Sequence, residues 1–122
     1  LSGYLQLAER LYKDPVAFSQ GWNFGPDVDQ AQPVSWIADR MVELWGDGAK
    51  WKDASEDNAP HEAQYLRLDS TLARTKLQWT PRLDLQGTLK LVVGWYQSVA
   101  KGESAESTTL NQIRQYEALA KR

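Results

Sequence analysis

The strongest constraint in this sequence is an apolar stripe that predicts one long amphipathic helix after Asp84. Its apolar residues are three or four positions apart, which places their side chains on one face of a helix. They are Leu85, Leu89, Val92, Val93, Tyr96 and Val99. The Asp84 carboxylate can accept hydrogen bonds from the free amides of the first turn, and Gly102 is expected to end the helix. The stripe predicts a scaffold helix, because none of its side chains is a catalytic group.

A shorter helix is expected immediately before this one. Asp69 is placed to cap its first turn, and Leu72, Ala73 and Leu77 would share one face. The link 78–82 should end this helix, because Pro81 disfavours a helical conformation at the residue before it.

Three further helices are expected elsewhere in the chain. The first begins at Ser2 and stops at Asp14, since Pro15 cannot continue the ladder of hydrogen bonds. The second begins at Pro33 and is closed by Gly46. The last would be capped by Ser107 or Thr108, and its apolar residues include Leu110, Ile113 and Tyr116.

Short strands are expected over 21–24 (GWNF), 49–52 (AKWK) and 65–68 (YLRL). They are too few and too short to make a sheet with satisfied edges. We therefore expect a fragment, or a domain that completes a sheet elsewhere. The predicted class is α/β: one mostly helical lobe over 1–122, with two or three short strands.

The overall composition sets the class of protein. The chain has 122 residues, of which 42% are hydrophobic, as in a globular domain, and its formal net charge is -2. Because nucleic-acid binding needs a basic face, no nucleic-acid partner is expected. No apolar run approaches the roughly 20 residues that span a bilayer, so no membrane partner is expected. The absence of cysteine excludes disulfides and thiolate metal sites and fits a cytoplasmic protein.

The familiar catalytic motifs are missing from the sequence. There is no Gly-rich phosphate loop and no Tyr-x-x-x-Lys pair, and His61 is the single histidine. Metal sites built on several histidines are therefore excluded, and a Ser-His-Asp triad would have to use His61 in a polar loop. We expect no catalytic, cofactor-binding or metal-binding residue in the chain itself.

Two pairs of residues are candidates for ligand contact. His61 and Glu62 lie in the segment PHEAQ and could be either a solvated pair or hydrogen-bonding partners of a polar ligand such as a ribose. A carboxylate suits a vicinal diol because it accepts from both hydroxyls. Asn23 and Gly25 lie at the end of the expected strand GWNF and serve either turn chemistry or contact with a ligand beyond the end of that strand.

Several segments together resemble one family. LDSTLARTKLQWTP and LQGTLKLVVGWYQ look like the carboxyl-terminal part of extended short-chain dehydrogenases that modify nucleotide sugars. LSGYLQLAERLY, GWNFGPD, ELWGDGAKW, PHEAQYLRLD and TTLNQIRQYE narrow the resemblance to the CDP-glucose 4,6-dehydratase branch. Gln78 stands where the family usually has glycine, so that turn must be accommodated differently.

The resemblance implies a lyase with a Rossmann-type fold. Such enzymes use bound NAD to oxidise the sugar at its 4-position, eliminate water, and return the hydride to the 6-position. Their NAD-binding and catalytic residues lie in an amino-terminal part, which this chain would lack, so the chain alone should be inactive. It would be the carboxyl-terminal lobe that binds the nucleotide sugar, CDP-glucose, in an enzyme expected to be a homodimer.

The resemblance also suggests a role for Glu62. It matches a glutamate that contacts the substrate ribose in related GDP-mannose dehydratases, whereas the arginine usual three residues earlier is Ala59 here. Two alternatives stay open. The chain could belong to another extended short-chain member, such as an epimerase or a GDP-mannose-type dehydratase, or it could be a stand-alone helical interaction module.

Overall fold

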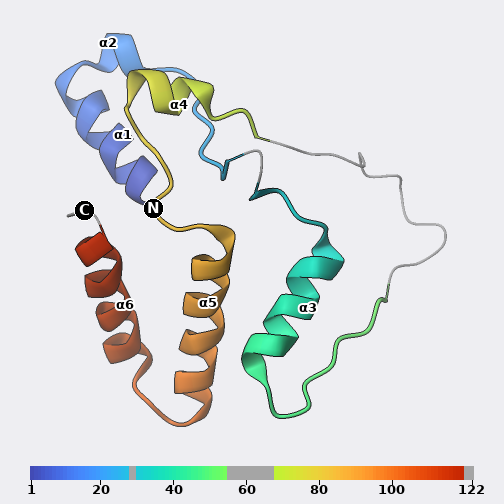
Figure 1. Cartoon of the computed structure of the whole chain (residues 1–122). Helices are drawn as coiled ribbons and strands as arrows, with labels where there is room; N and C mark the ends of the chain where they lie inside the picture. The colour runs from blue at the N-terminus through green and yellow to red at the C-terminus, as the bar shows by residue number, and fades with distance from the viewer. Residues whose placement is uncertain (28–29, 55–67, 120–122) are drawn as a thin grey trace. The chain divides into compact units, whose positions relative to one another are not determined.

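The structure, a computed structural model, describes residues 1–27, 30–54 and 68–119. This part contains six helices and no strand (Figure 1). They are α1 (Ser2–Lys13), α2 (Pro15–Phe18), α3 (Val34–Trp45), α4 (Thr71–Lys76), α5 (Leu85–Ala100) and α6 (Ala105–Leu119). The chain divides into two compact units, Leu1–Ala31 with Ala63–Pro81 and Gln32–Glu62 with Arg82–Arg122.

Helix α5 is the central element of the second unit and packs against both α3 and α6 (Figure 1). Its residues Leu89 and Val93 are buried. The Asp84 carboxylate accepts from the Gly87 amide at 2.6 Å, as an N-cap should. Gly102 has a φ of 89° just after the helix, where glycine adopts a left-handed conformation without steric cost. The prediction of this helix and of both its ends is confirmed.

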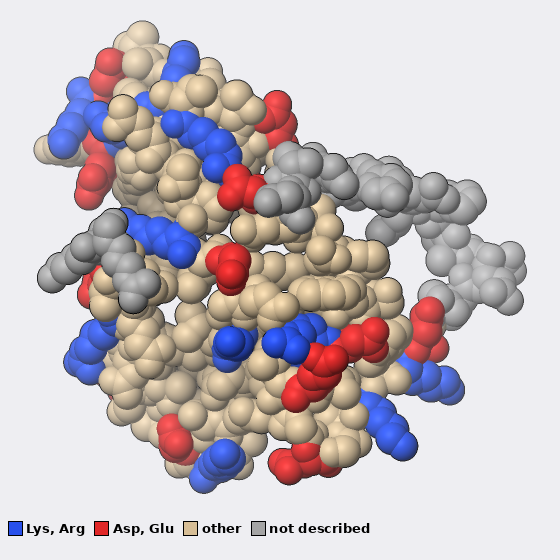
Figure 2. All heavy atoms as spheres, viewed as in Figure 1, with Lys and Arg blue, Asp and Glu red and all other residues tan. Residues whose placement is uncertain are grey.

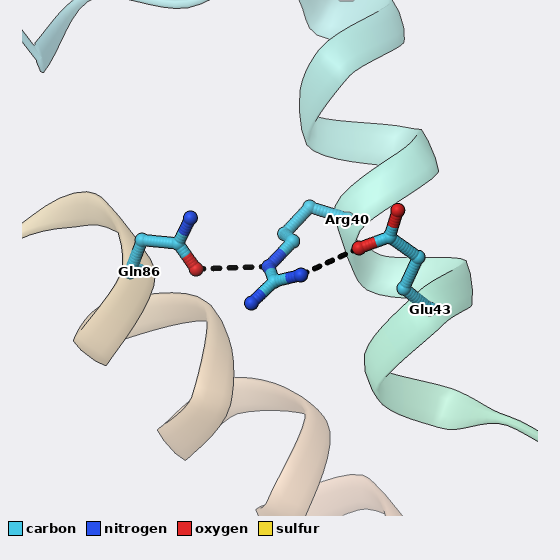
Figure 3. Close-up of polar contacts among 3 residues, drawn as sticks. All are labelled: Arg40, Glu43 and Gln86. Carbon is cyan, nitrogen blue, oxygen red and sulfur yellow. Dashed lines mark hydrogen bonds and ion pairs between the residues drawn. The ribbon is translucent and has the colours of Figure 1, made fainter.

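Polar side chains tie α3 to α5 (Figure 3). Arg40 on α3 donates from Nε to Gln86 Oε1 at 2.8 Å and forms an ion pair with Glu43 one turn further along its own helix. Near the other end of α5, Gln97 donates to the carbonyl oxygen of Trp45 at 2.8 Å. These bonds satisfy a carbonyl at the end of α3 and fix the register of the two helices.

Side chains also tie α5 to α6. Gln112 on α6 donates from Nε2 to the Leu91 carbonyl oxygen at 2.6 Å. The indole of Trp95 donates to the Thr109 hydroxyl at 2.9 Å. Trp95 therefore has a packing and hydrogen-bonding role between α5 and α6.

The first unit is organised around an aromatic cluster between α1 and the residues that follow α4. The Phe24 ring makes edge-to-face contacts with Tyr4 and Trp79, with ring centroids 5.3 Å and 5.1 Å away. Trp79 also donates to the Ser2 hydroxyl at 3.2 Å. Beside this cluster Leu77 is fully buried. Edge-to-face pairs add roughly 0.5–1.5 kcal/mol each beyond their burial.

Helix α4 ends in a turn that bears on the departure from the family pattern. Gln78, where the family resemblance leads us to expect glycine, has a φ of 56° and so adopts the left-handed conformation itself. The Trp79 amide donates back to the Ala73 carbonyl oxygen at 3.1 Å. In this turn the glutamine carries a steric cost that glycine would avoid.

Three helix starts differ from expectation. Helix α4 begins at Thr71 with Ser70 at the N-cap, so the predicted cap, Asp69, lies one residue before the observed one. Helix α6 begins at Ala105, and the hydroxyl that accepts from its first turn belongs to Ser104, not to Ser107 or Thr108. The short helix α2 was not expected; the Asp14 carboxylate caps it by accepting from the Ala17 amide.

The predicted strands are wrong for the residues that the structure describes. Residues 21–24 run without a hydrogen-bonded ladder, because no other described segment pairs with their backbone. In 49–52 the Trp51 indole donates to Asp39 at 2.7 Å, which directs this segment back to α3. Residues 65–67 lie outside the described part. The described fold is helical rather than α/β, and the expectation of two or three strands is overturned.

Charged side chains are interspersed on the visible face of the molecule, and neither sign forms one continuous tract there (Figure 2). This arrangement fits a formal net charge of -2. Within the described ranges, no helix combines the length and apolarity that crossing a membrane requires.

Candidate functional site

The candidate site is a cavity of about 220 Å³ in the first unit. It lies where the segment after residues 21–24 meets the start of α4. Its lining combines acidic, basic, hydroxyl and apolar side chains, namely Pro26, Asp27, Leu68, Asp69, Ser70, Thr71 and Arg74. Both sides of the cavity belong to the same compact unit.

Two of the residues singled out from the sequence hold this cavity together. Asn23 donates from Nδ2 to the Asp69 carbonyl oxygen at 3.3 Å. Gly25 is buried, and a Cβ atom there would lie 3.2 Å from Leu68 Cβ and 3.3 Å from Ser70 Oγ. A Cβ atom at these distances would be tightly packed, so Leu68 and Ser70 would have to shift slightly to admit one. Asn23 and Gly25 thus position the cavity wall, and their contact with a ligand stays a prediction.

An ion pair closes one side of the cavity. The Arg74 guanidinium lies 2.7 Å from the Asp27 carboxylate, and the two side chains are 30% and 47% exposed. A pair this open to solvent contributes about 0–1 kcal/mol to stability. Its more certain effect is to hold Arg74 in place and to neutralise its charge, so an anion gains little from this guanidinium.

Asp69 supplies a second carboxylate to the lining. Its Oδ1 accepts from the Thr71 amide at 2.8 Å. Hydrogen bonds from the Thr71 side chain, and then from the Thr71 backbone, lower the pKa of the Asp69 carboxyl below its ordinary value, because they favour the charged form. The cavity therefore presents two carboxylates and one guanidinium, a set suited to a neutral hydroxyl-bearing group rather than to a phosphate.

Ser70 has the one buried polar side chain of the lining. It is 6% exposed, and its Oγ has no hydrogen-bond partner among the described residues. The Oγ lies against Gly25, closed off from solvent, and no base in the described part of the chain donates to it or accepts from it. It therefore lacks the activation that a serine nucleophile needs. In residues 1–27, 30–54 and 68–119, no three His, Cys, Asp or Glu side chains gather in a way that could hold a metal ion.

The other two predicted site residues, His61 and Glu62, lie outside the described residues. Conversely, reasoning from the sequence did not find the ion pair between Asp27 and Arg74. These residues are far apart along the chain, and no local pattern links them. The sequence showed only an acidic residue soon after Gly25 and an arginine in a short helix, and neither feature indicates that the two side chains pair.

Comparison with known proteins identifies a dehydratase among the relatives of this chain. The chain is 45% identical to the CDP-glucose 4,6-dehydratase of Salmonella typhimurium over 116 residues, which is 95% of this chain. It spans 32% of the length of that relative. No family model matches the chain. The resemblance inferred from the sequence segments is confirmed.

Proposed function

We propose that this chain is the substrate-binding lobe of a nucleotide-sugar 4,6-dehydratase. The substrate would be CDP-glucose, which the complete enzyme would convert with NAD into the 4-keto-6-deoxy sugar. The observation that carries this proposal is the 45% identity to a CDP-glucose 4,6-dehydratase over 95% of the chain. A match this extensive supports a shared reaction far more strongly than a shared fold would.

In the complete enzyme, substrate binding and catalysis would belong to different parts of the protein. Residues 1–122 would form a single lobe that holds the nucleotide sugar, while residues outside this chain would bind NAD and carry out the chemistry. The complete enzyme would act as a cytoplasmic homodimer. The chain alone should then form no 4-keto-6-deoxy product from CDP-glucose and NAD, and measurable product would refute this division.

Within the lobe, Glu62 and His61 would contact the ribose of the nucleotide. The support is chemical: a carboxylate can accept from both ribose hydroxyls, and the neighbouring imidazole adds a further donor or acceptor. Asn23 and Gly25 would act less directly, by holding the segment 23–27 against the start of α4.

The role of Glu62 can be tested in a chimaera in which this chain replaces the matching third of the Salmonella enzyme. Loss of a ribose contact worth about 1–3 kcal/mol should weaken CDP-glucose binding about 5- to 150-fold in Glu62→Ala. Glu56→Ala, the same substitution in the same polar segment of sequence, is the matched control and should leave the affinity unchanged. Equal affinities in the two variants would eliminate Glu62 as a substrate contact.

The same chimaera separates the proposed substrate from those of other extended short-chain enzymes. Competition between CDP-, GDP- and UDP-glucose should favour the CDP sugar. Preference for a GDP or UDP sugar would instead indicate a GDP-mannose-type dehydratase or an epimerase. A chimaera that binds NAD but none of these sugars would favour a non-catalytic interaction module.

A further inference from the structure

We propose that the Asp47–Gly48 bond is a site of spontaneous conversion to isoaspartate. The site lies in the turn that ends α3, far in sequence from the candidate cavity and independent of the proposed function. It would be a modification site that needs no enzyme, only water.

This bond lies in an exposed turn. Gly46, Asp47 and Gly48 are all exposed, with φ values of 72°, 50° and 69°. Apart from the adjacent residues in the chain, no heavy atom of the described residues lies within 4 Å of where a Cβ would stand on Gly46 or on Gly48. The Ala49 amide donates to the Gly46 carbonyl oxygen at 2.9 Å, whereas the Gly48 amide has no partner in the part of the chain that the structure describes.

The reaction involves the side-chain carboxyl group of Asp47 and the backbone nitrogen of the next residue, Gly48. The Gly48 backbone nitrogen attacks Cγ of Asp47; the N–Cγ bond forms, the Cγ–O bond breaks, and the oxygen leaves as water. The product is a five-membered cyclic imide. Water then adds to the main-chain carbonyl carbon of Asp47 and breaks its bond to nitrogen, so the chain continues through Cγ. One water leaves and one returns, so the step is an isomerisation that needs no oxidant or cofactor.

The same reaction is hindered at other aspartates. A side chain on the following residue crowds the attacking nitrogen, and Asp47 is the aspartate here that precedes a glycine. Asp84 precedes a leucine, and its carboxylate is held by the Gly87 amide. The Asp39 carboxylate is held by the Trp51 indole. Neither carboxylate is free to reach its neighbouring nitrogen.

The modification would change the end of α3. It adds one carbon to the main chain inside the turn, so the hydrogen bond from the Ala49 amide to the Gly46 carbonyl oxygen could not keep its length. The Gly46 amide, which donates to the Val42 carbonyl oxygen at 3.0 Å to close the helix, lies just before the altered bond.

The test is ageing of the folded chain in 18O-labelled water at physiological temperature, followed by proteolysis and peptide mapping. Mass-spectrometric fragmentation distinguishes aspartate from isoaspartate in each peptide. Conversion should be several-fold faster in the Asp47 peptide than in the Asp84 peptide, and each converted residue should carry one 18O atom. Asp47→Asn should convert faster still, releasing ammonia through the same imide, and Asp47→Ser should give none.

Gly48→Ala should slow the conversion several-fold, because the added methyl group crowds the nitrogen. Since Gly48 has a positive φ, circular dichroism must first show that this variant keeps its helices; if it does not, the Asp47→Ser comparison decides. An Asp47 peptide that stays unchanged, or that converts no faster than the Asp84 peptide, would overturn the proposal.

Discussion

Ser70 is buried in the lining of the candidate cavity, and no described residue forms a hydrogen bond with its hydroxyl. Burying this unpaired hydroxyl lowers the stability of the folded chain. We expect Ser70→Ala to raise the free energy of unfolding by about 1 kcal/mol, since the desolvation cost of the hydroxyl disappears and little volume is lost. Urea unfolding followed by circular dichroism measures this change.

Gly25→Ala tests the same contact from the other side, because Gly25 packs against the Ser70 hydroxyl. It should lower the free energy of unfolding by about 1–3 kcal/mol, because the new methyl group would press on Leu68 and Ser70. If Ser70→Ala also destabilised the chain by that amount, the Ser70 hydroxyl would have a partner and the description of this contact would be wrong.

The Asp69 carboxyl gives a pH dependence with a definite sign. Its pKa is lowered in the folded chain, chiefly by hydrogen bonds from Thr71. Its contribution to stability is therefore present above the unfolded pKa of 3.8 and is lost as the pH falls through the lower folded value. Asp69→Asn should be less stable than the unmodified chain at neutral pH, and the difference should shrink in acid. A difference that stays constant with pH would contradict the role of the charge.

Individual site residues could be predicted from the sequence only where the signal was local. The sequence drew attention to Asn23 and Gly25, and the structure gives both a clear role in positioning the cavity wall. The pairing of Asp27 with Arg74 depends on how two distant segments meet, so no pattern within either segment predicts it.

At the scale of elements, helices were predicted well and strands were not. Helix α5 is specified by its own stripe, cap and terminal glycine, all of which lie within a few residues of one another. A strand exists only when another strand pairs with it, so the composition of GWNF could indicate an extended segment but could not supply its partner. The start of α6 was misplaced because three hydroxyl residues, Ser104, Ser107 and Thr108, can all serve as caps.

The turn after α4 contains a residue whose replacement should stabilise the chain. Gln78 has a positive φ, which costs a residue with a side chain roughly 1–2 kcal/mol that glycine does not incur. Because glycine also gains about 0.5–1 kcal/mol of freedom when unfolded, Gln78→Gly should stabilise the chain by about 0.5–1 kcal/mol. Denaturant midpoints measure the gain.

Gln78→Ala is the control for this turn. Alanine keeps a Cβ atom and hence the steric cost, so it should not reproduce the gain. Equal stabilisation by glycine and alanine would mean that the side chain, and not the backbone conformation, limits the end of α4.

At the scale of the whole chain, little apolar surface is sequestered. In the described part, the buried hydrophobic side chains are Ala73, Leu77, Leu89 and Val93, while Leu1, Tyr12 and Val16 are each more than 90% exposed. A chain of this size usually buries a larger core. The small buried core is consistent with the proposal that the chain works as a lobe of a larger enzyme.

The most direct test of that proposal is the turnover of CDP-glucose by the chimaera in which this chain replaces the matching third of the Salmonella dehydratase. With NAD present, the chimaera should form the 4-keto-6-deoxy product, while neither this chain nor the remaining part of the Salmonella enzyme should do so alone. A chimaera that folds and binds NAD yet leaves CDP-glucose unchanged would contradict the account.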